Sequence, residues 1–255
     1  MSSNGVPASG RTGAGTGRAR RAAVVGVVGA RGGVGTSTLA ALTAARLARR
    51  TSTVLVDLDP AAGGIDVTVG LEDVDGARWP ELAGARGDVP GEDVLALLPR
   101  WGACAVLSAD RDGAAPEPAV VVDVLHALAG VVGAVVLDLP RGAVPAAEAV
   151  LGACDLVAVV ARRDLRSVAG ALALRPRLVA AGTPAGLVVA GRAVGGLSVT
   201  ELATTVELPV LWSGALARGL ARAAERGVQP HRGPAVQAAR AVAGQVEASV
   251  LGVAR

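Results

Sequence analysis

The sequence contains no lysine, phenylalanine or tyrosine, and only two cysteines and three tryptophans among its 255 residues. Without aromatic bulk, a core must be built from Val, Leu and Ala, which suits helices packed on a parallel sheet better than an aromatic-rich sandwich. Two cysteines, Cys104 and Cys154, are too few for a disulfide framework, and we interpret both as small core residues of a cytoplasmic protein. Uncharged runs such as Leu178–Gly191 reach only 14 residues, whereas a membrane-spanning helix needs about 20.

Positive charge is concentrated at the N-terminus. Residues 1–21 contain four of the 25 arginines and no acid, so the remaining 21 arginines face all 22 acidic residues and leave a net charge of −1. A nearly neutral charge over the residues after 21 does not indicate broad nucleic-acid binding. Because residues 1–21 are rich in Gly, Ser and Arg with little to bury, we expect a disordered tail there. We expect a single domain over residues 22–252, since no internal repeat or second unit is evident.

Short apolar runs alternate with helical segments after the tail. Continuous runs without polar alternation predict strands that are buried on both faces. Right-handed crossovers through the intervening helices then give a doubly wound α/β fold, with a mostly parallel seven-stranded sheet and helices on both faces. The expected strands are Ala23–Gly29, Val54–Asp57, Ala103–Leu107, Ala134–Asp138, Leu156–Val160, Leu187–Ala190 and Val210–Trp212. The stretch Glu72–Asp93, rich in Gly, Pro and acids, is predicted to be a long surface excursion.

A glycine-rich loop, GARGGVGTST, links the first expected strand to the helical segment Ser37–Arg50. A strand, a glycine loop and a helix in this order are typical of a phosphate-binding loop, because backbone N–H groups and the positive end of the helix dipole converge on phosphate oxygens. Ser37 stands where a hydroxyl would bind Mg²⁺, and Thr38 can reach an inner phosphate. The alternative is a turn that only joins the strand to the helix.

Position 36 holds threonine, whereas the pattern G-x-x-x-x-G-K-[ST] has lysine at this place. The change removes the usual cation from the β- and γ-phosphates. We therefore predict weakened hydrolysis and weakened nucleotide binding. Arg31 lies in the same loop and offers a planar guanidinium suited to phosphate, which would compensate in part.

Acidic residues follow two of the expected strands. Asp57 and Asp59 end the stretch TVLVDLDP, and Asp138 ends the run in VVLDLP. Carboxylates at the C-terminal ends of strands beside a phosphate loop can hold Mg²⁺ or orient a water molecule. The alternative for each is a strand-end cap or an ordinary loop residue.

These motifs together resemble those of the ParA/MinD superfamily of deviant Walker ATPases. The resemblance is carried by the loop GGVGTST and by strands that end in DLDP and DLP, and it covers about residues 22–245. Within the superfamily, the stretches RWPELAGARG and VLDLPRG are similar to those of the CpaE/TadZ group, which includes the actinobacterial septum-site-determining proteins.

The resemblance implies roles for individual residues. Arg31 falls where the family has a signature lysine that reaches the partner's phosphates in a nucleotide-sandwich dimer, and Asp59 falls on the acid that positions the attacking water. Asp57 would lie near the metal, and Asp138 would be the Walker B acid that acts on Mg²⁺. The residues that would cradle the phosphates of ATP and its Mg²⁺ are Gly32, Gly33, Val34, Gly35, Thr36, Ser37 and Thr38. One departure concerns base recognition, because Gly191 and Arg192 stand where many relatives have an Asn that contacts the base.

Three functions are open from the sequence alone. The first is an ATP-binding protein with slow or absent ATPase activity, which forms an ATP-dependent homodimer and recruits protein partners. By the resemblance, these partners would lie at the septum, the cell pole or a Flp-type pilus or secretion apparatus. The second is a pseudo-ATPase scaffold that works only through protein contacts, which the threonine at position 36 favours. The third is a DNA-partition ATPase, against which the net charge of the body argues.

The C-terminal part contributes two weaker signals. Arg218, Arg222 and Arg226 are spaced four apart on an expected helix, and we interpret them as a solvated face rather than a DNA contact. The segment Ala235–Arg255 is Ala- and Val-rich with few charges, so it is expected to pack on the sheet or on a partner. It lacks the basic face of a membrane-binding helix, and any membrane contact is expected to be indirect.

Overall fold

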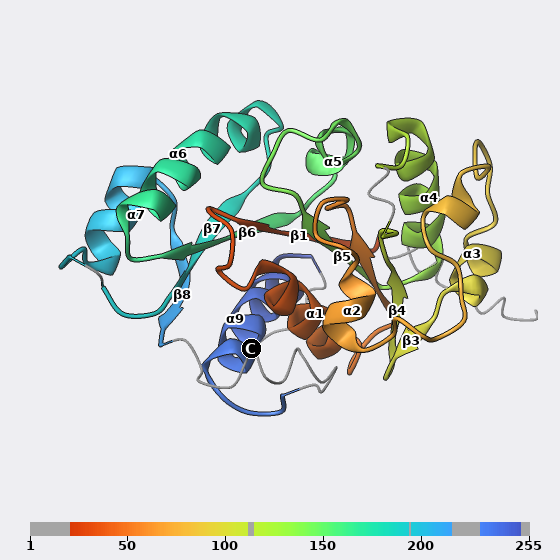
Figure 1. The fold of residues 1–255 in the computed structure, drawn as a ribbon, viewed down its shortest axis with the longest axis horizontal. Coiled ribbons are helices and arrows are strands. Elements are labelled where there is room, and N and C mark those ends of the chain that lie inside the picture. The colour runs from red at the N-terminus through yellow and green to blue at the C-terminus, as the bar shows by residue number, and fades with distance from the viewer. Residues whose placement is uncertain (1–20, 112–114, 194, 216–229, 251–255) are drawn as a thin grey trace, which may run out of the picture.

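The computed structural model describes residues 21–111, 115–193, 195–215 and 230–250, which form three layers with a central sheet (Figure 1). The first half contains β1 (Ala23–Gly29), α1 (Thr36–Leu47), β2 (Thr53–Asp57), α2 (Ile65–Val69), a 3-10 helix (Pro80–Leu82), α3 (Gly91–Leu97), β3 (Arg100–Trp101), β4 (Cys104–Leu107) and α4 (Pro118–Val131). The second half contains β5 (Ala134–Leu139), α5 (Pro145–Leu151), β6 (Leu156–Arg162), α6 (Leu165–Ala180), β7 (Ala185–Ala190), α7 (Val199–Val206), β8 (Val210–Gly214) and α9 (Pro234–Ser249).

One eight-stranded sheet has the order β3-β4-β2-β5-β1-β6-β7-β8. All neighbouring strands are parallel except β3 and β4. The predicted doubly wound, mostly parallel fold is confirmed, but the expected count of seven strands is one too few. The additional strand consists of Arg100 and Trp101, and a run of two residues carries no recognisable pattern. Because β1 lies between β5 and β6, the loop that follows it starts near the middle of the sheet.

Helices cover both faces of this sheet (Figure 1). Residues of α3, α4, α5, α6 and α7 form a core with one face, and residues of α1, α2 and α9 form a core with the other. Both cores consist chiefly of Val, Leu and Ala, as the absence of Phe and Tyr requires. β1 contributes side chains to both cores, since Val24 and Val28 belong to the first core and Val25 and Val27 to the second. This double burial explains why its sequence is a continuous apolar run.

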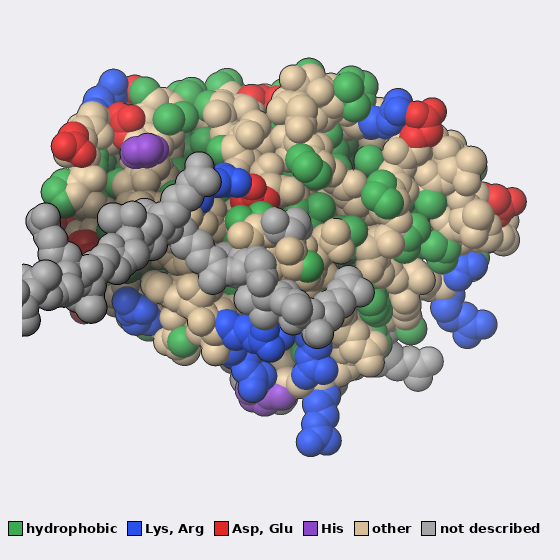
Figure 2. Space-filling view, turned by 180° about the vertical axis from the view of Figure 1, so that it is seen from behind, with side chains coloured by type: hydrophobic (Ala, Val, Ile, Leu, Met, Phe, Trp, Pro, Cys, Tyr) green, Lys and Arg blue, Asp and Glu red, His purple; other side chains and the backbone are tan. Residues whose placement is uncertain are grey.

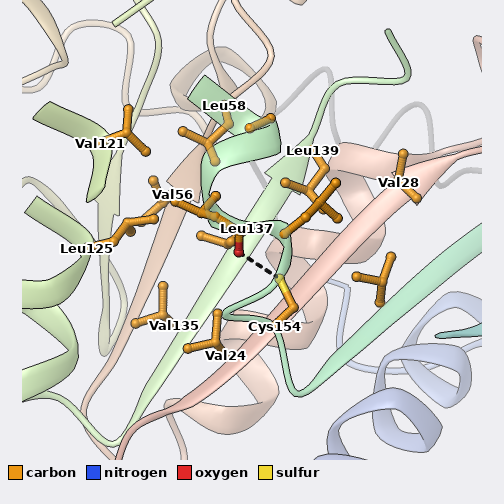
Figure 3. Packing of buried hydrophobic residues seen from close by; sticks show 14 of the residues in the cluster. Val24, Val28, Val56, Leu58, Val121, Leu125, Val135, Leu137, Leu139 and Cys154 are labelled. Carbon is orange, nitrogen blue, oxygen red and sulfur yellow. Dashed lines mark hydrogen bonds between the residues drawn. The ribbon is translucent and has the colours of Figure 1, made fainter. Parts of the chain in front are cut away.

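The two cysteines lie in these cores. Both are buried and free, as predicted. Figure 3 shows Cys154 among Val24, Leu137 and Leu139, and its thiol donates a hydrogen bond to the carbonyl oxygen of Val150 at 3.7 Å. Burial raises the pKa of the Cys154 thiol to about 12, so this group packs as a small apolar side chain.

The stretch Glu72–Asp93 corrects the prediction of a loose surface excursion. It contains the 3-10 helix and the start of α3, and Trp79 within it is only 2% exposed. The Trp79 indole N–H donates to the carbonyl oxygen of Asp57 at 2.7 Å. A buried indole that also has a hydrogen-bond partner fastens this stretch to the end of β2.

Arg78 also holds the same stretch in place, through hydrogen bonds to α2 and to the chain that follows it. Its Nε donates to Oδ2 of Asp66 at 3.0 Å, and its Nη2 donates to the carbonyl oxygens of Leu71 and Val74. The planar guanidinium therefore joins α2 to the chain that follows it. In the motif RWPELAGARG, the Arg and the Trp thus serve the architecture around the strand that carries Asp57.

The C-terminal helix packs against α1 and β8, as predicted for this segment. Its buried residues are Ala238, Ala239, Val242, Ala243, Val246 and Glu247. The expected basic stripe at Arg218, Arg222 and Arg226 and the tail at residues 1–20 lie outside the described residues. Within the described ranges, no helix has the length and apolar character needed to cross a membrane.

Charge is mixed on the face drawn in Figure 2. Basic side chains gather at its lower centre, whereas acidic side chains lie mainly along its upper and outer parts. This distribution agrees with the near balance of charge in the body of the sequence.

Candidate functional site

The loop between β1 and α1 leaves its backbone N–H groups without partners. Gly35 is the N-cap of α1 and provides no side-chain cap. Among the described residues, no group accepts a hydrogen bond from the N–H groups of residues 32–38. Two carbonyl oxygens of the loop are occupied, because Arg31 Nη1 donates to Gly32 and Arg162 Nη2 donates to Gly33, each at 3.1 Å. Free N–H groups at a helix N-terminus form a site for an anion.

Two glycines of the loop have a backbone conformation that other residues rarely adopt. Gly33 has φ 69° and Gly35 has φ 91°. A Cβ atom at either position would meet no atom within 4 Å, so strain of the backbone, not a clash, makes glycine necessary there. At Gly29 the reason is space, since a Cβ atom would lie 2.5 Å from Oγ1 of Thr36. The Thr36 hydroxyl is therefore close to the start of the loop.

A cavity of about 410 Å³ lies over this loop, at the edge where the parallel strands end. It brings together most of the residues that the sequence predicted for the site. Those that line it are Arg31, Gly32, Gly33, Gly35, Thr36, Ser37, Thr38, Asp59 and Asp138. Val34 is not among them, because its side chain is 2% exposed and belongs to the core with α1. Val34 is therefore part of the loop but does not line the cavity.

Asp138 is a buried carboxylate at the end of β5. Burial raises its pKa well above the usual value, and the neighbouring charges of Asp57 and Asp59 raise it further, whereas a hydrogen bond from the Ser37 side chain lowers it. Such a carboxylate is costly to keep ionised without a nearby cation. The pair of Ser37 and Asp138 therefore offers two oxygen ligands where a divalent cation would relieve this cost.

Asp57 is placed differently from Asp138, although the two are register partners on β2 and β5. Its Oδ1 accepts the N–H of Asp59 at 2.9 Å, and its Oδ2 accepts the N–H groups of Ile65 at 2.7 Å and Ala109 at 3.3 Å. Asp57 does not line the cavity. Its carboxylate thus binds the backbone of two loops, as the alternative of a strand-end cap implies.

Asp59 lines the cavity and is partly exposed. Its Oδ1 accepts the N–H of Ala61 at 3.2 Å, while its own N–H is bound by Asp57. The buried aspartate therefore fixes the backbone from which the exposed one projects. A half-exposed carboxylate in this position can orient a water molecule in the cavity.

Arg31 is ion-paired within the chain. Its Nε and Nη2 donate to Oδ2 of Asp164 at 3.2 and 3.0 Å. Asp164 is also the N-cap of α6, where its Oδ1 accepts the N–H of Ser167 at 2.8 Å. Partial burial raises the pKa of Asp164, but the hydrogen bonds from Ser167 and Arg31 outweigh it and hold the pKa below its ordinary value. Arg31 is thus an ion-paired cation at the rim of the cavity.

A second cavity, of about 480 Å³, lies at the same edge of the sheet beyond β7 and β8. Arg163, Gly191, Arg192 and Ser213 are among the residues that line it. The two positions that the resemblance links with base recognition, Gly191 and Arg192, therefore line a cavity.

Sequence reasoning missed two polar residues that line the first cavity. Thr68 comes from α2, and Arg141 comes from the loop after β5. The motif VLDLPRG contains Arg141, yet an arginine in a loop looks in a sequence like any solvated surface residue. Only the cavity shows that its neighbours are the glycine loop and Asp138.

Comparison with protein families and curated proteins gives two findings. A family model described as cellulose biosynthesis protein BcsQ matches residues 22–177. Two curated proteins from strains of Mycobacterium tuberculosis, both described as uncharacterized, are 42% identical over 191 residues, which are 75% of this chain and 54% of each relative. The chain thus spans about half the length of the curated relatives it matches.

Solved structures share the fold at low sequence identity. A chain of the MinC:MinD cell division protein complex of Aquifex aeolicus has a TM-score of 0.75 at 19% identity, covering 92% of this chain and 99% of that one. The septum site-determining protein MinD of Pyrococcus horikoshii, complexed with Mg-ADP, has 0.74 at 18%, covering 89% and 96%. A ParA family ATPase of Chlorobium tepidum has 0.71 at 16%, covering 91% and 98%. The architecture is therefore shared across almost the whole length.

Proposed function

The chain belongs to the family described as cellulose biosynthesis protein BcsQ and has the fold of ParA and MinD ATPases, and from this premise we propose that it binds ATP with Mg²⁺ and acts as a nucleotide-responsive positioning protein. The observation that supports this most strongly is the cavity over the glycine loop. There, loop residues whose N–H groups have no described partner line the same cavity as the side chains of Ser37, Asp59 and Asp138. This set suits a phosphate chain with a divalent cation.

Ser37 and Asp138 fit Mg²⁺ as oxygen ligands. Within the described ranges, no three His, Cys, Asp or Glu side chains are grouped as metal ligands, so the remaining ligands would be phosphate oxygens and water, as Mg²⁺ prefers. When bound, Mg²⁺ would neutralise charge on the phosphates. In this proposal Asp57 acts indirectly, because its oxygens already hold the backbone beside Asp59.

Asp59 is the proposed group that orients the attacking water. The threonine at position 36 leaves the phosphates without their usual lysine, so we propose that hydrolysis is slow. A slow reaction is compatible with a switch that depends on which nucleotide is bound.

The proposed output of the switch is an ATP-dependent homodimer in the cytoplasm that recruits other proteins. Arg31 lies at the rim of the cavity, where a second subunit would approach, and it would exchange Asp164 for the partner's phosphates. The stretches RWPELAGARG and VLDLPRG support a finer placement with the CpaE/TadZ group and the septum-site-determining proteins. On that basis the protein partners are proposed at the septum, the cell pole or a Flp-type pilus assembly.

A scaffold that works without nucleotide is the second candidate. It is favoured by the neutral side chain at position 36 and by the ion pair that occupies Arg31. In this case the fold would serve protein contacts alone, and the loop N–H groups would bind only water.

Equilibrium titration with a fluorescent ATP analogue, with and without Mg²⁺, separates the two candidates. The control is Gly35→Val, which forces a β-branched residue into a backbone with φ 91°. We expect Mg²⁺-dependent binding in the micromolar range for the wild type and none for the control. Absence of binding at millimolar nucleotide would reject the nucleotide switch and favour the scaffold.

A further inference from the structure

The proposed phosphate site lacks a lysine but not positive charge. Among the described residues that line the cavity, two are cationic, Arg31 and Arg141. Arg31 is already bound to Asp164 and to the carbonyl oxygen of Gly32. The Thr36 side chain is neutral, and its hydroxyl lies close to Gly29. Arg141 is thus the cation of this cavity whose side chain has no partner among the described residues.

The side chain of Arg141 is exposed and forms no hydrogen bond or ion pair with any described residue. Its backbone, in contrast, is held firmly. Arg177 Nη1 donates to the carbonyl oxygen of Arg141 at 2.7 Å, and Nη2 donates to that of Gly142 at 3.2 Å. The Gly142 carbonyl oxygen also accepts the N–H of Val144 at 3.0 Å. Arg141 therefore combines a free guanidinium with a fixed loop that lines the cavity.

Arg177 is itself fixed. It belongs to α6, and its Nε donates to Oε1 of Glu148 in α5 at 2.9 Å. The pair of Arg177 and Glu148 thus connects two helices to the loop that follows Asp138. The pair is part-buried, and it limits where the loop can place Arg141.

We propose that Arg141 supplies the phosphate-binding charge that position 36 lacks, and that Arg177 is the positioning residue that holds it in place. The proposal rests on nucleotide binding in the same cavity. A guanidinium presents two parallel N–H groups to two phosphate oxygens, so it can replace the ammonium of a lysine as a ligand for the β- and γ-phosphates. The charge then comes from the loop after β5 instead of the loop after β1.

Titration with mant-ATP and Mg²⁺ tests the assignment. We expect Arg141→Ala to weaken binding at least about tenfold, as loss of a charge-assisted hydrogen-bond pair does. The matched control is Arg100→Ala, which removes an exposed arginine from edge strand β3. Binding of mant-AMP, which has no β- or γ-phosphate, should change by less than about threefold in Arg141→Ala.

Restoring the missing lysine gives a sharper result. Thr36→Lys introduced into Arg141→Ala should recover most of the lost mant-ATP affinity, because the two positions would supply the same charge. Arg177→Ala should weaken binding in the wild type but cause no further loss in Arg141→Ala, which is the signature of a residue that acts through another. Thermal unfolding of each variant shows whether it is folded before it is titrated.

The outcomes separate this inference from the proposed function. If the wild type does not bind mant-ATP at all, nucleotide binding is wrong and the inference falls with it. If the wild type binds and Arg141→Ala binds within threefold of it, nucleotide binding stands and the role of Arg141 is wrong. Failure of Thr36→Lys to restore binding would also overturn the equivalence of the two positions.

Discussion

Asp57 carries its carboxylate in the interior, where water does not stabilise the charge. Burial raises its pKa from 3.8 to about 6, although the N–H groups of Asp59, Ile65 and Ala109 lower it. The folded protein therefore holds this proton more tightly than the unfolded chain does. Between these two pKa values the unfolded chain has lost the proton while the folded protein keeps it, so raising the pH favours unfolding.

The free energy of unfolding should consequently fall as the pH rises from about 4 to about 6. The part due to Asp57 is on the order of 3 kcal/mol at most. Asp57→Asn has no proton to lose at this position, so its stability should depend less on pH over the same range. Urea unfolding of both proteins at several pH values measures the difference, and parallel curves would contradict the assignment.

The sequence indicated which residues meet at the cavity but not how each is used. The glycine loop, Ser37, Asp59 and Asp138 were predictable because strand ends and loops of a parallel sheet share one edge. The bonds of Asp57 were not, because they depend on loops that reach it from residues 65 and 109. The role of Arg141 was not predictable, because the sequence does not show which arginines form ion pairs and which keep a free side chain.

At the scale of elements, α6 is pressed against the start of the glycine loop. A Cβ atom at Gly170 would lie 1.7 Å from the carbonyl oxygen of Ala30. The N–H of Ala30 also donates to the carbonyl oxygen of Val160 at 2.9 Å. The helix and β6 therefore fix the backbone from which the loop departs.

Gly170→Ala should destabilise the protein by about 1–3 kcal/mol, because the clash with backbone exceeds the gain in helix propensity of about 1 kcal/mol. Gly244→Ala in α9 is the matched control. A Cβ atom there meets nothing within 4 Å, so this variant should gain about 0.5–1 kcal/mol. Thermal or urea unfolding gives both values, and equal effects of the two changes would disprove the close contact.

Elements with long apolar runs were predictable, whereas those that depend on single tertiary contacts were not. The seven expected strands are all present. Burial on both faces makes the inner strands continuously apolar, whereas edge strand β8 is only partly buried. β3 exists only through its pairing with β4. The stretch around Trp79 packs on the protein because one indole is buried in the core, although its Gly, Pro and acidic residues are typical of a surface loop.

At the scale of the whole molecule, the proposed switch predicts a change of oligomeric state. If Asp59 orients the attacking water, Asp59→Ala should keep ATP intact and increase the dimeric fraction with Mg²⁺ and ATP present. Size-exclusion chromatography with light scattering measures that fraction, and Mg²⁺ with ADP provides the baseline. A dimeric fraction unchanged between wild type and variant under ATP would reject hydrolysis as the step that resets the switch.

The position of β1 has a consequence for local opening. Strands at the edge of a sheet can detach while the rest stays folded, but a strand with two parallel neighbours and helices on both faces cannot. Backbone amides of Val25 and Val27 should therefore exchange with solvent deuterium only when the whole molecule unfolds, and those of edge strand β8 much sooner. The glycine loop is attached to the strand that is expected to exchange most slowly, so the point from which it departs is fixed before any ligand arrives.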